Sequence, residues 1–226
     1  ARALLVQGVV VEVSYNIQAA VDNKHNLVVA THTINRNDLN ALGAIALEAK
    51  ENLAVETFTV LVDKGYHNGR EIDQCKKHNI TTIVAHPTPG RSKESVTQPE
   101  YLVAQFQYNK SDDTYTCPQG ETLKTTGKWH KKSGRTEQSG YHFKKYRTPA
   151  CNECPVKHLC TSRTAGREID RSQYADAVEE NNKRYQENPQ LYRTRQEINE
   201  HIFGTIKRQW GYNHTNLTGL EKVNGE

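Results

Sequence analysis

Residues 58–84 read FTVLVDKGYHNGREIDQCKKHNITTIV, and this stretch decides the fold class. Phe58 to Val62 is a short, nearly continuous apolar run, which is typical of a strand that is covered on both faces. The chain from about Gly69 to His78 predicts a helix, and residues 80–84 (ITTIV) predict another strand. This succession indicates a domain in which helices pack on a sheet.

The residues before this stretch add a hairpin and another helix. Residues 9–21 (VVVEVSYNIQAAV) and 26–34 (NLVVATHTI) are rich in β-branched residues and predict two strands, with turn chemistry at 22–24 between them. Asn37 or Asp38 is expected to cap the helix that follows. The resulting β-β-α-β-α-β order predicts an α/β or α+β domain with a mixed sheet.

The pattern changes after Pro87. Residues 87–175 are rich in Gly, Pro, Thr, Ser and Lys, which predicts an irregular, β-rich insertion. One strong helix is then expected from Pro189 to about Trp210. We therefore expect three parts: 1–86 as the first part of the core, 87–175 as a cysteine-rich insertion, and 176–226 as a helical part of the core.

The chain is polar and mildly basic, with a mean hydropathy of -0.83 and a net charge of +4. This balance suits a nucleic-acid partner without requiring one. No apolar run approaches the roughly 20 residues that span a bilayer, and no leader marks a signal peptide, so a cytoplasmic location is expected. The first residue is Ala1 and the chain contains no Met, from which we expect an internal fragment.

Two acidic residues are candidates for a catalytic site. Asp63 ends the buried strand, and Gly65 allows a tight turn that leaves the carboxylate exposed. The competing interpretation is that Asp63 caps the helix that follows. Glu200 shares one face of the long helix with Arg193 and Lys207. A carboxylate flanked by cations suits metal and DNA, whereas a solvated helix face with ordinary ion pairs is the alternative.

Four of the five cysteines lie in the insertion, at Cys117, Cys151, Cys154 and Cys160. A Cys-x2-Cys-x5-Cys run with a further cysteine in Cys-Pro-x-Gly fits a tetrahedral Zn²⁺ site. Zinc would organise an insertion that otherwise lacks a core. An iron–sulfur cluster and four ordinary reduced cysteines are the alternatives, and His142 or His158 could substitute as ligands.

Basic and aromatic residues interleave within residues 124–147. This mixture suits contact with phosphates and unstacked bases, and a solvated charged loop explains it equally well. The residues are Lys124, Lys128, Trp129, Lys131, Lys132, Arg135, Tyr141, Phe143, Lys144, Lys145, Tyr146 and Arg147.

Several segments resemble the DDE transposases of bacterial insertion sequences. They are YNIQAAVDNKHNLVVATHTINRNDLNAL (15–42), VLVDKGYHNGREI (60–72), YTCPQG…CNECPVKHLCTS (115–162) and EINEHIFGTIKRQWGY (197–212). The resemblance covers nearly the whole chain. It implies an RNase H-like mixed sheet flanked by helices, with a zinc-ribbon-like insert between the second and third catalytic acids.

The resemblance also implies roles for particular residues. Asp63 resembles the second catalytic acid, and Glu200 resembles the third, within E-H-x-F-G-T-I-K. Lys207 falls at the family's E-x6-K spacing, where a lysine contacts DNA near the cleaved end. The further DNA-contacting positions are Tyr192, Arg193 and Arg195. The family's usual Tyr-x2-Arg-x3-Glu spacing leads to Asn199 instead, and Glu197 is the fallback acid.

The first catalytic acid of the family lies on a strand before the one that reads YNIQAAV here. We expect it upstream of Ala1, because Asp22 belongs to the hairpin turn. The chain is therefore expected to carry two of three catalytic acids and to be inactive alone.

The implied activity is metal-dependent DNA strand cleavage followed by strand transfer. The implied cofactors are Mg²⁺ or Mn²⁺ at Asp63 and Glu200, and structural Zn²⁺ at the cysteines. The implied partners are transposon ends and target DNA, with a homodimer in the synaptic complex, no membrane, and a bacterial cytoplasm where the bound protein is associated with the nucleoid. The alternatives are a non-catalytic, zinc-stabilised DNA-binding remnant and a metal-dependent nuclease.

Overall fold

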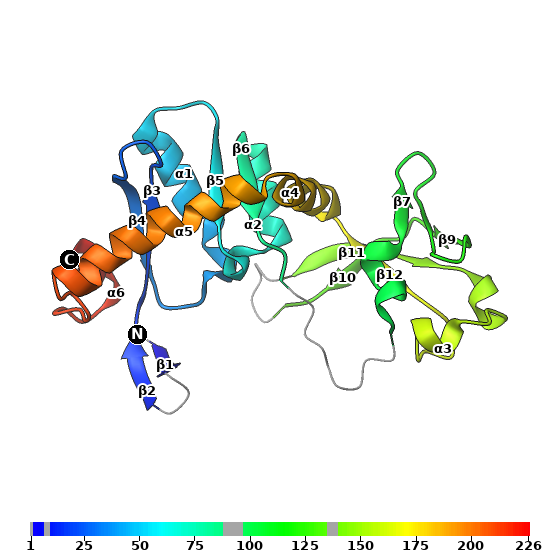
Figure 1. The fold of residues 1–226 in the computed structure, drawn as a ribbon. Coiled ribbons are helices and arrows are strands. Elements are labelled where there is room, and N and C mark those ends of the chain that lie inside the picture. The colour runs from blue at the N-terminus through cyan, green and yellow to red at the C-terminus, as the bar shows by residue number, and fades with distance from the viewer. Residues whose placement is uncertain (1, 7–9, 88–96, 135–139) are drawn as a thin grey trace. The chain divides into compact units, whose positions relative to one another are not determined.

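The computed structural model describes residues 2–6, 10–87, 97–134 and 140–226, and the chain divides into two compact units (Figure 1). The first unit combines Ala1–Pro87 with Asp176–Glu226, and the second is Thr88–Ala175. The second unit is therefore inserted within the sequence of the first. In the parts of the chain just given, no helix is both long and apolar enough to cross a membrane.

The strands of the first unit form three pairs. β1 (Arg2–Val6) pairs antiparallel with β2 (Val10–Ser14), β3 (Asn16–Val21) antiparallel with β4 (Val28–Ile34), and β5 (Phe58–Val62) parallel with β6 (Ile80–Val84). Between the described residues, no strand pairing joins these three pairs into one sheet. Strands of both pairing types occur together with helices, and the predicted α/β class is confirmed.

The helices of the first unit come from both ends of the chain. Before the insertion lie the 3-10 turn η1 (Asp38–Asn40), α1 (Leu42–Leu53), the 3-10 turn η2 (Lys64–Tyr66) and α2 (Gly69–Lys77). After it come α4 (Ala175–Glu187), α5 (Pro189–Gly204), the π-helical turn η7 (Thr205–Gln209) and α6 (Leu220–Gly225). Asn68 caps α2 with its side-chain oxygen, which accepts from the N–H of Arg70 at 3.0 Å.

Two sequence predictions about the first unit are wrong. The strand predicted over residues 9–21 is two strands, because β2 pairs with β1 whereas β3 pairs with β4. The predicted helix cap at Asn37 or Asp38 is also absent: α1 begins at Leu42 without a side-chain cap. The carboxylate of Asp38 instead accepts hydrogen bonds from β3.

The core of the first unit is completed by residues on both sides of the insertion. Its buried members are Leu42, Ala46, Ile72, Cys75, Ile80, Val84 and Ala177. Burying one aliphatic side chain of this size contributes about 1.5–3 kcal/mol. Ala177 comes from α4, and Arg184 on the same helix donates from Nε to the carbonyl of Thr82 at 3.0 Å. The chain after the insertion therefore packs on the chain before it.

The second unit is an antiparallel sheet with short helices. The strands are β7 (Gln107–Asn109), β8 (Thr114–Thr116), β9 (Thr122–Thr125), β10 (His130–Lys132), β11 (Tyr141–Arg147) and β12 (Ile169–Ser172), and the helices are η3 (Pro99–Tyr101), η4 (Val103–Gln105), η6 (Pro149–Asn152) and α3 (Lys157–Cys160). The strand order is β10-β11-β9-β8-β7, with β12 on β11. The prediction of a β-rich insert is confirmed.

A small aromatic core holds this sheet together. Its buried members are Phe106, Tyr115, Leu123, Tyr146 and Ile169. The rings of Tyr115 and Tyr146 meet edge to face at 5.0 Å. The carboxylate of Asp113 accepts from the hydroxyl of Tyr146 at 2.5 Å and pairs with Lys144 at 2.6 Å. These contacts satisfy the polar end of the buried phenol.

Candidate functional site

Asp63 lies directly after β5, at the edge where the parallel strands β5 and β6 both end. Its side chain is exposed, and it accepts a hydrogen bond from the N–H of Lys64 at 2.7 Å. The backbone continues as η2, closed by the N–H of Tyr66 on the carbonyl of Asp63 at 3.0 Å. Asp63 thus begins a short 3-10 turn, yet its carboxylate remains open to solvent.

A second carboxylate, that of Asp38, lies beside this turn. Its Oδ1 accepts from Asn16 Nδ2 at 2.6 Å and from Gln18 Nε2 at 3.1 Å. A Cβ atom at Gly65 would stand 3.0 Å from Oδ2 of Asp38, so the carboxylate would have to shift slightly if any larger residue stood there. Sequence reasoning missed this placement; the available signal was the pair of amides, Asn16 and Gln18, at alternate positions of a β-strand.

Tyr66 lies in the same turn, and its hydroxyl is affected by the charge of both acids. Burial raises the pKa of its hydroxyl, and the negative charges of Asp38 and Asp63 raise it further. The phenol is therefore neutral at physiological pH and can donate a hydrogen bond at this edge.

Helix α5 reaches the same edge through Tyr192. Its hydroxyl donates to the carbonyl of Val62 at 3.2 Å, and its ring meets that of Tyr185 at 4.9 Å. The pKa of Tyr192 is raised by burial, with a further contribution from the charge of Asp63. The guanidinium of Arg195 lies 5.2 Å from the Tyr192 ring, and its buried Nε has no hydrogen-bond partner. Tyr192 thus docks the helix beside Asp63.

Glu200 lies farther along α5 and is exposed. It follows Tyr192 by eight residues, a rise of roughly 12 Å along an α-helix. Arg193 and Lys207 are exposed as well, but Lys207 lies in the π-helical turn η7, where the seven-residue spacing no longer fixes a common face. Tyr192 thus contacts the β5 edge through its hydroxyl, and Glu200 lies about two helical turns beyond it along α5.

The end of α5 offers cations and an aromatic ring. Lys207 lies in the π-helical turn η7, with its Nζ 5.8 Å from the ring of Phe203. Arg208 is exposed next to it, and Trp210 is 73% exposed. The sequence pattern did not single out Arg208 and Trp210, because only the E-x6-K spacing pointed to this stretch.

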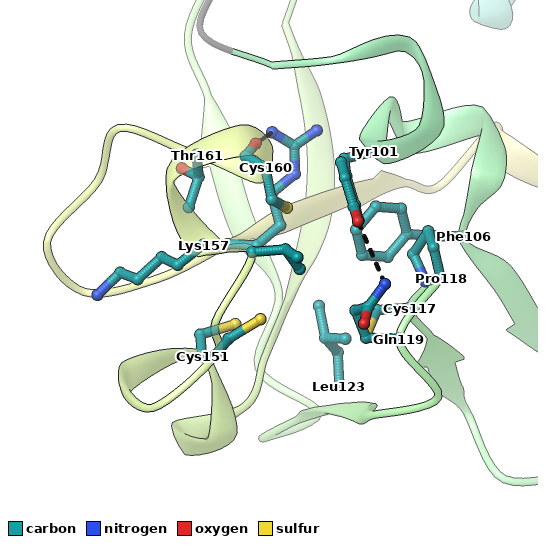
Figure 2. Close-up of a pocket in the computed structure, with 13 residues that line it drawn as sticks. Tyr101, Phe106, Cys117, Pro118, Gln119, Leu123, Cys151, Lys157, Cys160 and Thr161 are labelled. Atoms are coloured by element: carbon teal, nitrogen blue, oxygen red, sulfur yellow. Dashed lines mark hydrogen bonds between the residues drawn. The ribbon is translucent and has the colours of Figure 1, made fainter.

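The four cysteines of the second unit line one pocket, together with Phe106 and Leu123 (Figure 2). Cys117 follows β8, Cys151 lies in η6, and Cys160 ends α3. The pKa of Cys160 is raised by burial, while the cation Arg167 opposes the shift and the other three cysteines add to it. The shared pocket brings together cysteines from separate segments of the sequence. His142 and His158 are exposed and do not line the pocket.

Two neighbouring residues shape the wall of this pocket. Gly166 has a φ of +84°, and a Cβ atom there would collide with the Cβ of Cys151. Arg167 lies over the ring of Phe106 at 5.7 Å, and its buried Nε has no hydrogen-bond partner. The pocket therefore combines four thiols with one half-buried cation.

Neither the candidate acids, Asp63 and Glu200, nor the four pocket cysteines form a closed coordination shell. Over the described stretches, no group of three or more His, Cys, Asp and Glu side chains is arranged to hold a metal ion. The donor chemistry nevertheless fits: thiols suit Zn²⁺, and the carboxylates at the β5 edge suit Mg²⁺ or Mn²⁺.

The basic segment 124–147 is partly neutralised within its own unit. Lys144 pairs with Asp113 at 2.6 Å, while Lys145 and Arg147 both pair with Glu168. Trp129 is 48% exposed, with Nζ of Lys144 at 5.2 Å from its ring. Arg135 lies outside the described residues. Lys124, Lys128, Lys131 and Lys132 are exposed, which leaves them as the candidates for phosphate contact.

Comparison with known proteins gives one match. A family model described as "Transposase DDE domain" matches residues 116–226, a segment that contains Glu200, Lys207 and the four clustered cysteines. Asp63 precedes the matched segment. Searches of curated proteins and of solved structures return no match.

Proposed function

We propose that this chain forms part of a DNA transposase catalytic domain that cleaves DNA strands and transfers them to a target, because residues 116–226 match the family model described as "Transposase DDE domain". The observation that carries the proposal is the exposed Asp63 carboxylate at the β5 edge, next to which Tyr192 docks the helix that bears Glu200. A dimer that pairs two transposon ends would fit this activity.

Asp63 and Glu200 are the residues that would hold divalent cations. Cations there would activate the attacking oxygen and stabilise the leaving oxygen of a phosphodiester. The two side chains supply hard anionic oxygens, and Mg²⁺ retains water in its remaining positions. The contribution of the protein is then mainly positioning and charge, so the loss of one acid would reduce the rate by orders of magnitude.

The packing of α5 is compatible with an approach of Glu200 to Asp63. No residue of α5 is fully buried. Tyr192 provides the fixed point, through its hydrogen bond to the carbonyl of Val62. For the two acids to share an ion, α5 would have to move so that Glu200 approaches the β5 edge when metal and DNA bind.

The cations of α5 are proposed to bind the DNA backbone. Arg193 and Lys207 are exposed, and Arg195 has an unpartnered Nε beside Tyr192. Lysine and arginine contacts to phosphates give affinity that falls steeply with salt concentration. Trp210 is 73% exposed at the end of this stretch and could stack on an unpaired base.

The catalytic proposal is tested by comparing acid variants in the intact protein with DNA that carries the transposon ends. Asp63→Asn and Glu200→Gln should each abolish cleavage and strand transfer, with DNA binding within about twofold of wild type. Glu197→Gln is the matched control, since Glu197 is exposed on the same helix. Loss of activity in Glu197→Gln with full activity in Glu200→Gln would identify Glu197 as the acid. Cleavage without joined products would indicate a nuclease, and full activity in Asp63→Asn would refute the proposal.

We further propose that Cys117, Cys151, Cys154 and Cys160 bind one structural Zn²⁺. The support is that all four line one pocket within a unit whose buried core is small. Protein purified without chelators should contain about one zinc per chain, and Cys154→Ser should lose it. Cys75→Ser is the control, because Cys75 lies in the first unit. Visible absorption with bound iron would indicate a cluster instead, and metal-free protein with a folded second unit would contradict the site.

A further inference from the structure

Asp38 lies next to the turn that follows Asp63, and its two carboxylate oxygens have different surroundings there. Its Oδ1 accepts from two amides of β3, those of Asn16 at 2.6 Å and Gln18 at 3.1 Å. Its Oδ2 faces Gly65, where a Cβ atom would stand only 3.0 Å away. The segments that carry the two acids are also linked by Asn68, whose Nδ2 donates to the carbonyl of Leu39 at 2.8 Å and to Oδ1 of Asn40 at 2.7 Å.

The charge of Asp38 is not balanced by a basic side chain. Its hydrogen-bond partners are neutral amides, and across the described residues it forms no ion pair with a Lys, Arg or His. A half-buried carboxylate next to a second carboxylate is destabilised by repulsion unless a cation lies between them. The structure of this edge therefore favours a bound cation.

Gln18 gives independent evidence for a ligand at this place. Its side chain is 3% exposed and contacts Asp38 through Nε2, while its Oε1 is buried without a hydrogen-bond partner. An unsatisfied buried amide oxygen costs about 1–3 kcal/mol. A cation with its water shell would supply the missing partner, because a coordinated water donates hydrogen bonds.

We propose that Asp38 is a further acid of the cation site at Asp63, and that the two carboxylates hold one hydrated divalent cation between η1 and η2. This inference rests on the proposed function of Asp63 and adds a residue that the sequence places in a helix cap. Oxygen ligands and retained water are what Mg²⁺ and Mn²⁺ prefer. Asn16 and Gln18 then act as positioning residues that orient the Asp38 carboxylate toward Gly65.

The test measures Mn²⁺ binding to the intact protein without DNA, by the electron paramagnetic resonance signal of unbound Mn²⁺. Asp38→Asn keeps a side-chain oxygen that can accept from Asn16 and Gln18 but removes the charge. It should weaken Mn²⁺ binding at least about tenfold, as should Asp63→Asn. Asp73→Asn is the matched control, since Asp73 on α2 pairs with Lys77, and it should bind as wild type does.

The outcomes separate the two proposals. Weak binding in Asp63→Asn with wild-type binding in Asp38→Asn would overturn the role of Asp38 and leave that of Asp63 standing. Wild-type binding in both variants would overturn the cation site itself.

A second measurement uses only the wild-type protein, in case Asp38→Asn does not fold. Substoichiometric Mn²⁺ should broaden the side-chain amide resonances of Asn16 and Gln18. The side-chain amide of Asn52 is the internal control. It donates to the carbonyl of Val29 near the start of β4, whereas Asn16 pairs with Ile34 at the end of that strand. Unbroadened Asn16 and Gln18 signals, or equal broadening of all three, would overturn the proposed position.

Discussion

The side chain of Asn181 hydrogen-bonds both backbone groups of Val84, accepting from the N–H at 2.9 Å and donating to the C=O at 3.0 Å. Both residues are fully buried, and they lie on opposite sides of the insertion in the sequence. One amide thus satisfies the end of β6, where the strand has no pairing partner besides β5 among the described residues.

Asn181→Ala should therefore destabilise the first unit more than its small change in volume suggests. The substitution leaves two buried backbone groups without partners, and we expect a loss of about 2–5 kcal/mol in the free energy of unfolding. Lys183→Ala on the exposed side of α4 is the control and should change stability by less than about 0.5 kcal/mol. Urea denaturation followed by circular dichroism measures both, and similar midpoints for the two variants would contradict the prediction.

The second unit should lose stability in acid. Hydrogen bonds from Lys144 and Tyr146 lower the pKa of Asp113 to about 2. Burial raises the pKa of Glu168, but Arg163, Lys145 and Arg147 outweigh it and bring the value to about 2. Both folded-state values are depressed, so these carboxylates stabilise the fold above their ordinary pKa, and the stabilisation disappears as the pH falls from about 4 toward 2.

A single-tryptophan variant isolates this effect. With Trp210→Phe, the emission of Trp129 reports on the second unit alone, since the chain has two tryptophans. Asp113→Asn in this background should lower stability at pH 7 and flatten its dependence on pH below 4. An acid-unfolding profile identical to that of the parent would show that Asp113 does not contribute.

Thiol chemistry should separate Cys75 from the other cysteines. Cys75 is 1% exposed, and burial raises its pKa to about 12, with the charge of Glu71 adding to the shift. The folded protein should therefore show no reaction at Cys75 with a thiol reagent at pH 8. The four pocket cysteines should react after a chelator is added, and Cys75→Ser should give the same count as wild type. Rapid labelling of Cys75 in the native state would contradict this.

Gly166 and Gly120 form a matched pair for testing the cysteine pocket. Both have positive φ angles, +84° and +85°, so alanine at either position introduces backbone strain of about 1–2 kcal/mol. Only at Gly166 would the new methyl group collide with Cys151, whereas nothing lies within 4 Å at Gly120. Gly166→Ala should weaken zinc binding at least about tenfold in competition with a chromogenic chelator, and Gly120→Ala should not. Equal zinc affinities would place the metal away from Cys151.

The local sequence pattern was sufficient to predict the strand–helix–strand segment at residues 58–84. The apolar run from Phe58 and the cap at Asn68 are encoded within a few residues, and the observed elements match the predicted ones to within one residue. The role of Asp38 was not accessible in this way. Its partners Asn16 and Gln18 lie 22 and 20 residues earlier, and capping rules consider only the following turn.

The candidate functional residues also divide into those that a local pattern indicates and those that depend on long-range packing. The spacing of the four cysteines predicted that they lie together, and all four line one pocket; their role as metal ligands stays a prediction. The position of Glu200 relative to Asp63 depends on how α5 packs, and no sequence interval encodes that. The partial neutralisation of the basic segment was invisible for a similar reason, since Glu168 lies 21 residues beyond Arg147.

The interrupted core has a consequence for synthesis on the ribosome. Ala177, Asn181 and Arg184 become available only after the whole intervening unit has been translated. Until then, the nascent N-terminal portion lacks the contacts of α4 with β6. It therefore exposes apolar surface and strand edges that favour aggregation. Rapid, self-contained folding of the intervening unit would shorten the distance over which α4 has to search for β6, and would so limit the time for which β6 is unprotected.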